Sequence, residues 1–525
     1  MKNYKGYFPF VAITLFFIVI YYNCFDTKLD LNGDNATYIR LARNIAEGLG
    51  YSNISSEGVA PASHFPPGYS AFLSLFVTLG LDNLILFKIL NGVLLLFSIF
   101  MLYMLSCRLS GNKALALTAS ILICFSPHLM HFASMAMSEM LYLMFTVLAF
   151  VALYRYTASK HLFYKSPWFY IALLSAVVSY HVRTVGASII FAVLLFFLFR
   201  KEWKASLASL FGMVLLLLPW IVRNTVYGIE SRYFGTIMTV NPWRPELGTV
   251  SSVGEMFSKM ITNIDETVIK GFREILFPFL DINYQEPSSA MGIVAGLLVT
   301  CVVLYGCWSL GGRNFRFPFL AFILANIGLF ALWHGGNGSR YVVPIAPYLF
   351  FFFYFGLYNI VILTLQKVLK LSVNESKMKW QPYLLLLMLL PMVAPVKEQS
   401  AIAAQPFPPA YKHYFKLAET IEQQLPAGSV VSCRKPELFD YFAPSHYASR
   451  YPFTNDSEKM LSGLLAGNVD FVILEQLGYS STVLYLLPVV QNHPDLFRVV
   501  AHIPNPDTYL LYFDKVKAKE FLQKR

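Results

Sequence analysis

The sequence is poor in charged residues. Only 14% of its 525 residues are charged, whereas 56% are hydrophobic, and this balance excludes a large soluble protein. Cysteine is scarce too: the six cysteines fall mostly in apolar runs, without the spacing of a disulfide framework or a metal centre. No GxGxxG motif and no P-loop occurs, so no nucleotide site is assigned. The chain is therefore expected to be a polytopic α-helical membrane protein.

The sequence is rich in long apolar runs. A membrane-spanning helix needs about 20 apolar residues, and eleven segments approach that length, so a fold of about eleven transmembrane helices is expected. No small-residue cleavage site follows the first run, which is therefore expected to be a retained span rather than a signal peptide. The expected spans are 7–22, 84–106, 114–127, 138–154, 167–181, 185–199, 205–222, 290–308, 317–333, 341–364 and 381–396.

The basic residues predict the orientation. The net charge is +11, but these residues lie in short connections between apolar runs, without the basic and aromatic interleaving of a nucleic-acid groove. Short connections rich in lysine and arginine are cytoplasmic, which places the N-terminus in the cytoplasm. The basic residues concerned are Lys2, Lys5, Arg108, Lys113, Arg155, Lys160, Lys165, Arg200, Lys201, Lys204, Arg313, Arg316, Lys367, Lys370, Lys377 and Lys379.

This orientation leaves three large pieces on the outer side. They are the loops 23–83 and 223–289 and the segment 397–525, which is long enough for a core of its own. In that segment YFKLAETIEQQL predicts a helix, while GSVVSC, VDFVILE, FRVVAHI and TYLLYF predict strands. We expect a transmembrane domain over 1–396 and a periplasmic α/β domain over 397–525.

A short helix after the first span places a carboxylate at its start. In GDNATYIRLARNIAEGL one stripe is apolar and the opposite stripe is polar, so the helix should lie flat in the membrane interface. Asp34 could be the N-cap of this helix or a functional carboxylate. The apolar stripe comprises Tyr38, Leu41, Ala42, Ile45 and Leu49, and the polar one Thr37, Arg40, Arg43, Asn44 and Glu47.

A second carboxylate, Glu139, opens a later apolar run in MAMSEMLYL. The residue could simply favour the positive end of the helix dipole, with Ser138 as the cap. Alternatively, Asp34 and Glu139 converge on one cavity, where paired carboxylates serve acid–base chemistry or hold a divalent metal. The spacing in the sequence leaves both alternatives open.

Two arginines stand at membrane edges on the same side. Arg183 lies in SYHVRTVG with His181 and Thr184, where it marks a bent hairpin or binds an anion. Arg340 lies in WHGGNGSRYVVP, where the guanidinium suits phosphate oxygens and the glycines allow close approach of a ligand. Tyr341, next to Arg340, is a further candidate for phosphate binding, and His334 and Asn337 lie in the same segment. The other pocket candidates, His64 and Tyr69, lie in the first loop, where the prolines of HFPPGY are expected to form a rigid turn.

Four pieces, GDNATYIRLARNI, HFPPGYSAFL, MSEMLYL and SRYVVPIAPY, occur in this order over residues 1–365. Together they resemble the GT-C glycosyltransferases, in particular the branch of protein O-mannosyltransferases and lipid A aminoarabinose transferases. The resemblance implies inverting transfer of a sugar from a polyprenyl phosphate to an acceptor hydroxyl on a lipid, glycan or protein, at the periplasmic face of a bacterial inner membrane. No sugar nucleotide is implied. Protein O-mannosyltransferases carry Asp-Glu where this chain has Asp34-Asn35, which argues against protein mannosylation.

The resemblance also implies roles for individual residues. Asp34 matches the essential first-loop acid, a general base, and Glu139 matches an acid that binds the acceptor or a divalent ion. Arg340 matches the basic residue that holds the donor phosphate, and Arg183 is a second candidate for that task. Asp34 and Arg340 are expected to share one pocket.

Two other classes of protein fit parts of this pattern. A transporter or flippase of lipid-linked sugars also carries charges in the membrane, but usually has inverted repeats, and none is visible here. An oligosaccharide ligase or polymerase of similar topology would release a lipid pyrophosphate instead of a phosphate.

Overall fold

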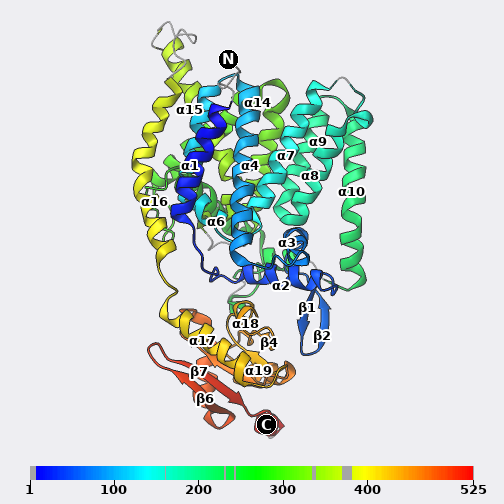
Figure 1. The fold of residues 1–525 in the computed structure, drawn as a ribbon, viewed down its shortest axis with the longest axis vertical. Helices are drawn as coiled ribbons and strands as arrows, with labels where there is room; N and C mark the ends of the chain where they lie inside the picture. Colours follow the sequence, from blue (N-terminus) through cyan, green and yellow to red (C-terminus); the bar gives the residue numbers. More distant parts are fainter. Residues whose placement is uncertain are drawn as a thin grey trace.

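The computed structural model describes residues 7–159, 161–229, 232–241, 244–333, 338–368, 370 and 381–523. A bundle of apolar helices forms the upper part of the molecule in Figure 1, and a sheet with flanking helices forms the lower part. The chain is therefore a polytopic helical membrane protein with a C-terminal α/β region, as expected from the sequence.

The bundle helices fall where the apolar runs predicted them. Short turns join most of them, and each expected span contains an apolar helix. The helices are α1 (Phe8–Cys24), α4 (Leu84–Ser110), α5 (Lys113–Cys124), α6 (Pro127–Ala133), α7 (Glu139–Ala158), α8 (Pro167–Val182), α9 (Ala187–Phe199), α10 (Trp203–Val226), α14 (Ala290–Leu332), α15 (Ala346–Lys367), the 3-10 helix η8 (Gln381–Met388) and α16 (Leu389–Ala404).

Seven helices of the described chain are long and apolar enough to cross a membrane, or eight if α5 and α6, bent by 64°, count as one span. The α14 helix supplies two of the seven, because Gly312 interrupts it with a positive φ. Shorter apolar helices, Phe8–Cys24, Pro167–Val182 and Thr184–Phe199, account for the other expected spans. The total of eleven crossings stays a prediction.

Close helix packing forms the core of the bundle. The α14 and α15 helices approach so closely that a Cβ atom at Gly306 would collide with the backbone of Phe352. Small residues at helix crossings allow such contact inside a membrane. Beside this crossing, the ring of Phe150 meets Phe319 and Phe322 edge to face, at centroid distances of 4.9 and 5.5 Å.

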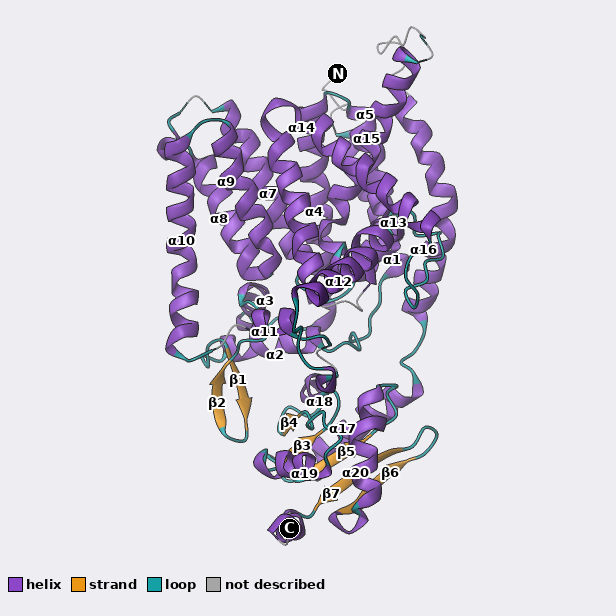
Figure 2. Cartoon of the chain, turned by 180° about the vertical axis from the view of Figure 1, so that it is seen from behind, coloured by secondary structure: helices purple, strands orange, loops and turns teal. Residues whose placement is uncertain are grey.

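The end of the bundle that faces the sheet carries the elements of the two loops that were predicted to be periplasmic, here called the outer elements. Figure 1 shows α2 lying across this end, with the β1–β2 hairpin beside it, and Figure 2 shows α12 on the reverse side. The outer elements are α2 (Asp34–Ala46), β1 (Ser52–Ser55), β2 (Gly58–Pro61), α3 (Gly68–Thr78), α11 (Arg232–Met238), the 3-10 helix η4 (Pro245–Leu247), α12 (Val253–Ile264), the π-helix η5 (Asp265–Lys270) and α13 (Gly271–Leu276).

The surroundings of α2 decide between the alternatives for Asp34 and show what contacts the polar stripe. Gly33, at φ +91°, occupies the N-cap position and Asp34 is the first helical residue, so Asp34 is not the cap. The polar stripe is partly covered: Asn44 is buried and donates to the Ser52 carbonyl at 2.7 Å, and Arg40 pairs with Asp440 of the C-terminal region, whereas Glu47 is exposed. The α2 helix is therefore held between the bundle and the C-terminal region.

The C-terminal region contains a five-stranded mixed sheet in the order β4-β3-β5-β7-β6. The β3 strand is parallel to β4 and β5, whereas β7 is antiparallel to β5 and β6. The predicted helix and four predicted strands are confirmed, and β4 was not expected. The elements are α17 (Pro409–Gln424), β3 (Val430–Ser432), α18 (Pro436–Phe442), β4 (Tyr447–Ser449), α19 (Ser457–Ala466), β5 (Phe471–Leu474), the π-helix η9 (Thr482–Leu486), α20 (Leu487–Asn492), the 3-10 helix η10 (Pro494–Leu496), β6 (Phe497–Ile503), β7 (Thr508–Phe513) and α21 (Lys515–Gln523).

The predicted orientation agrees with the arrangement of the helices but stays a prediction. The α4 helix begins beside α3 near the sheet, so its last turn with Arg108 lies at the opposite end, where α1 also begins (Figure 1). Of the basic residues that predicted this orientation, Lys2, Lys5, Lys160, Lys377 and Lys379 lie outside the described residues.

Candidate functional site

Asp34 and Arg340 form an ion pair between Oδ2 and Nη2, although they lie 306 positions apart in the chain. The turn at Gly33 starts α2 and presents Asp34 at its first residue. Arg340 lies in the 3-10 helix η6 (Gly338–Tyr341), directly before a second 3-10 turn, η7 (Val343–Ile345), and α15. Both side chains remain about one quarter exposed, 26% and 25%. The structure thus brings together the two charges that were expected to share a pocket.

Glu139 and Arg183 form a second ion pair, 2.7 Å from Nη1 to Oε1. Glu139 is the first residue of α7, and the turn before it is fixed by Asn91, whose amide donates to the carbonyls of Met135 and Met137. Unlike Asp34, the Glu139 side chain is 0% exposed. Its second oxygen, Oε2, has no hydrogen-bond partner among the residues that the structure describes.

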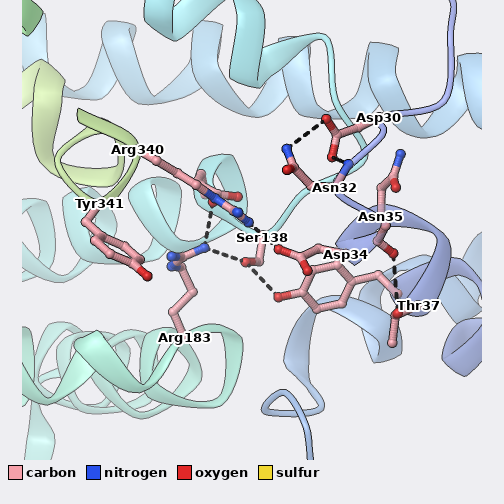
Figure 3. A network of polar contacts seen from close by, with 12 residues as sticks. Asp30, Asn32, Asp34, Asn35, Thr37, Ser138, Arg183, Arg340 and Tyr341 are labelled. Atoms are coloured by element: carbon pink, nitrogen blue, oxygen red, sulfur yellow. Dashed lines mark hydrogen bonds and ion pairs between the residues drawn. The ribbon is translucent and has the colours of Figure 1, made fainter. Parts of the chain in front are cut away.

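The two ion pairs form one electrostatic cluster, shown in Figure 3. Arg340 interacts with Glu139 as well as Asp34, and the two arginines repel each other. Burial opposes the charge of each arginine, but the facing carboxylates more than offset that cost, so the pKa of Arg340 and of Arg183 is raised. Both guanidiniums therefore stay charged, side by side, at one end of the bundle.

Ser138 and Tyr38 connect the two ion pairs. The Ser138 hydroxyl accepts a hydrogen bond from Arg183 Nη1 at 3.0 Å and lies 3.2 Å from the Tyr38 hydroxyl on α2. The alternative in which the Ser138 side chain caps α7 is therefore wrong, because it makes no capping bond. Its hydroxyl instead links α2, which carries Asp34, to the α7–Arg183 pair.

A third carboxylate, Asp30, was missed by the sequence analysis. It stands one turn before Asp34 and accepts hydrogen bonds from the backbone and the side-chain amide of Asn32, both at 3.2 Å. Burial raises the pKa of Asp30, Asp34 adds to that rise, and the charges of Arg340 and Lys435 oppose it. The spacing of four residues to Asp34 in DLNGD was the only signal for it in the sequence.

Of the remaining pocket candidates that the structure describes, only Tyr341 lies at the site. Tyr341 lies beside the arginines in Figure 3, and its hydroxyl accepts a hydrogen bond from Trp333 Nε1 at 2.9 Å. Tyr69 is fully buried behind Tyr38, with ring centroids 5.0 Å apart, and therefore acts as a packing residue. His64 is exposed and stacks edge-on against Phe65. His334 and Asn337 lie outside the described residues.

The residues do not fit a divalent metal at Asp34 and Glu139. Each carboxylate already binds an arginine, so a cation there would have to displace two guanidiniums or approach them closely. Among the described residues, no group of three or more histidine, cysteine, aspartate or glutamate side chains is arranged to hold a metal. The site is instead arranged as cations facing carboxylates, which suits an anionic ligand.

Solved structures provide the comparison. The oligosaccharyltransferase of Archaeoglobus fulgidus, tethered to an acceptor peptide with an NVT sequon, matches with a TM-score of 0.58 at 12% identity, covering 98% of this chain and 75% of that one. ArnT from Cupriavidus metallidurans bound to undecaprenyl phosphate matches with a TM-score of 0.57 at 12% identity, covering 97% and 98%. No protein-family model and no curated protein sequence matches the chain.

Both of these neighbours are GT-C membrane glycosyltransferases. The chain has the GT-C fold. The apo form of ArnT also matches over 97% of this chain, with a TM-score of 0.54 and 14% identity. Since these matches cover 97% of this chain, the likeness includes the C-terminal α/β region as well as the bundle. At these identities the likeness establishes the fold, and the activity has to be argued from the site.

Proposed function

We propose that the chain is an inverting glycosyltransferase that moves a sugar from a polyprenyl phosphate to an acceptor hydroxyl on the periplasmic face of the membrane. The observation that carries the proposal is the partly exposed Asp34–Arg340 ion pair beside the buried Glu139–Arg183 pair. Two charged guanidiniums suit a phosphate monoanion, and a carboxylate beside them suits a base. The undecaprenyl phosphate bound to the similarly folded ArnT supports a polyprenyl donor.

In the proposed reaction the donor phosphate first takes the place of Asp34 on Arg340. A phosphate oxygen and a carboxylate oxygen compete for the same N–H groups of the Arg340 guanidinium. Arg183, already held by Glu139, would lie close enough to share the phosphate charge, while Tyr341 flanks it. This exchange frees an oxygen of Asp34 to accept a proton.

The chemical step then balances as follows. The acceptor hydroxyl gives its proton to Asp34 while its oxygen attacks the anomeric carbon on the face opposite the phosphate. The bond from that carbon to the phosphate oxygen breaks, and the polyprenyl phosphate leaves with the electron pair. Arg340 and Arg183 stabilise the negative charge that develops on the phosphate. The sugar is transferred with inversion.

Glu139 would take part through its second oxygen. This buried Oε2 atom makes no hydrogen bond in the described chain, and a buried acceptor without a partner is costly. A hydroxyl of the acceptor or of the donor sugar that reaches Glu139 would satisfy it. Glu139 is thus proposed as a ligand-binding carboxylate, and Asp34 as the base.

A reaction with purified protein and no ion gradient tests the proposal. The donors are undecaprenyl-phosphate hexoses and pentoses, and the acceptors are lipids and glycans extracted from cells lacking the protein. We expect undecaprenyl phosphate to accumulate together with a glycosylated product, detected by mass spectrometry.

Each class of alternative gives a different result in this experiment. Release of undecaprenyl pyrophosphate from pyrophosphate-linked donors, with none from the phosphate donors, would identify an oligosaccharide ligase or polymerase. Movement of the lipid-linked sugar between leaflets without its consumption would identify a transporter or flippase.

A further inference from the structure

The first outer loop and the C-terminal region share one hydrophobic core. Leu29 and Ala36, which flank the turn before Asp34, are 4% and 2% exposed. They pack in the same cluster of buried side chains as Leu438 and Phe439 of α18. The loop that presents Asp34 is therefore not an independent element of the bundle.

Polar contacts extend this interface on both sides of the apolar contact. The Lys435 ammonium donates a hydrogen bond to the carbonyl of Asn32 at 2.9 Å, and Arg40 pairs with Asp440. The Arg43 guanidinium lies 5.5 Å from the centroid of the Tyr441 ring. In Figures 1 and 2, α18 lies between α2 and the sheet, so these contacts join the bundle to the C-terminal region.

The contacts converge on the turn that aims Asp34. Asp30 holds the amide groups of Asn32, Lys435 holds its carbonyl, and Gly33 has a left-handed φ of +91°. A side chain at Gly33 would meet the Cβ atom of Glu437 at 3.3 Å. With the turn held on both faces, the position of Asp34 depends on the docking of α18.

We propose that Lys435 is a positioning residue: by binding the Asn32 carbonyl, it makes the placement of Asp34 conditional on docking of the C-terminal region. The inference rests on the proposed function only in taking Asp34 as the base. Lys435 is 8% exposed and touches the turn rather than the Asp34–Arg340 pair, so it is expected to govern turnover rather than donor binding. A displacement of a catalytic group by about 1 Å can lower a rate by about a hundredfold.

The test compares Lys435→Met, Lys435→Arg and a matched control in the full-length protein. The control is Lys459→Met, which removes a lysine of the same region whose side chain is 77% exposed. We expect Lys435→Met to lower kcat by about tenfold to a hundredfold, with donor KM and undecaprenyl phosphate affinity unchanged. Lys435→Arg should restore much of kcat, and Lys459→Met should match the wild type.

Hydrogen–deuterium exchange in nanodiscs separates this inference from the proposed activity. Losing a charge-assisted bond should raise exchange of the amides of residues 31–37 by about tenfold in Lys435→Met, and this readout needs no substrate. Raised exchange in that variant would support the positioning role even if the wild type transferred no sugar. Unchanged exchange, or an altered acceptor KM with unchanged kcat, would overturn it.

A second pair of variants covers the case in which Lys435→Met does not fold. Arg40→Asp should loosen the turn and lower kcat, because it places like charges at the Arg40–Asp440 contact. Combining it with Asp440→Arg should restore both exchange and kcat. Failure of the double variant to recover either quantity would refute the dependence on docking.

Discussion

The two ion pairs of the site differ in what surrounds them. Glu139 is completely buried and Arg183 is 19% exposed, whereas Asp34 and Arg340 are each about a quarter exposed. Glu139–Arg183 is also linked through Ser138 to Tyr38. Of the two pairs, Glu139–Arg183 is thus the more enclosed, and a ligand would meet Asp34–Arg340 first.

Because of this difference, removing one partner should lower the stability of the protein by different amounts in the two ion pairs. Removing one partner of a buried pair leaves an uncompensated charge and is strongly destabilising. Asp34 and Arg340 are each about a quarter exposed, so removing one of them should cost less, because water can replace the lost contact. The partly exposed Asp34–Arg340 pair is therefore the one that a phosphate can open. Buried Glu139 keeps Arg183 in place.

The largest expected effect is on catalysis at the exposed pair. Asp34→Asn should lower the rate of sugar transfer by about 10²- to 10⁴-fold, since a general base contributes that much. The free energy of unfolding should change by about 1 kcal/mol or less. Turnover of polyprenyl-phosphate sugar and thermal unfolding in detergent measure the two effects. Asp82→Asn, at an exposed pair with Arg43, is the control; wild-type-like turnover in Asp34→Asn would eliminate the proposed mechanism.

At the buried pair the expected effect is on stability. Glu139→Gln keeps the shape but leaves Arg183 without its counter-charge, which should cost about 2 to 5 kcal/mol of unfolding free energy. Thermal or denaturant unfolding should therefore show a clear loss that Asp34→Asn does not share. If both variants proved equally stable, the contrast between the pairs would not hold.

Binding of the sugar donor should depend on the guanidinium group of Arg340. Arg340→Ala is expected to weaken binding of undecaprenyl phosphate by about tenfold to a hundredfold, because a charge-assisted contact is lost. Arg340→Lys keeps the charge but not the planar pair of donors, so it should give an intermediate affinity. A binding titration in detergent measures both, and unchanged affinity in Arg340→Ala would remove this residue from the donor site.

The smallest expected effect is the most specific to the proposed exchange. Asp34→Asn removes the carboxylate that competes for Arg340, so undecaprenyl phosphate should bind a few-fold more tightly to this inactive variant than to the wild type. The same titration measures it. Weaker binding would mean that Asp34 helps to hold the phosphate rather than yielding Arg340 to it.

Much of this architecture could be predicted from the sequence. The helices of the bundle follow from long apolar runs, and β7 follows from the aromatic and β-branched residues of TYLLYF, because both patterns are local. The three residues of β4 have no such pattern, since their place is fixed by pairing with β3. The α2 helix was predicted from its two stripes, but the covering of the polar stripe by α18 depends on a docking that no local pattern encodes.

The same division applies to the site. Asp34, Glu139, Arg183 and Arg340 could be singled out because charges at the membrane edge are costly and therefore need a reason. The pairing of Glu139 with Arg183 was not predicted, because either arginine could face either acid. Lys435 gave no signal, because a lysine in an outer region is ordinary until the fold places it against the Asn32 carbonyl.

The shared core of Leu29, Ala36 and α18 has a consequence for biogenesis. Arg40 and Asp440 are separated by 400 positions, which a ribosome translates in about 20 to 80 s. During that interval the loop that carries Asp34 has been synthesised, but α18, against which it packs, has not. The catalytic centre would consequently be assembled last, and a prematurely terminated chain could insert its helices without ever gaining activity.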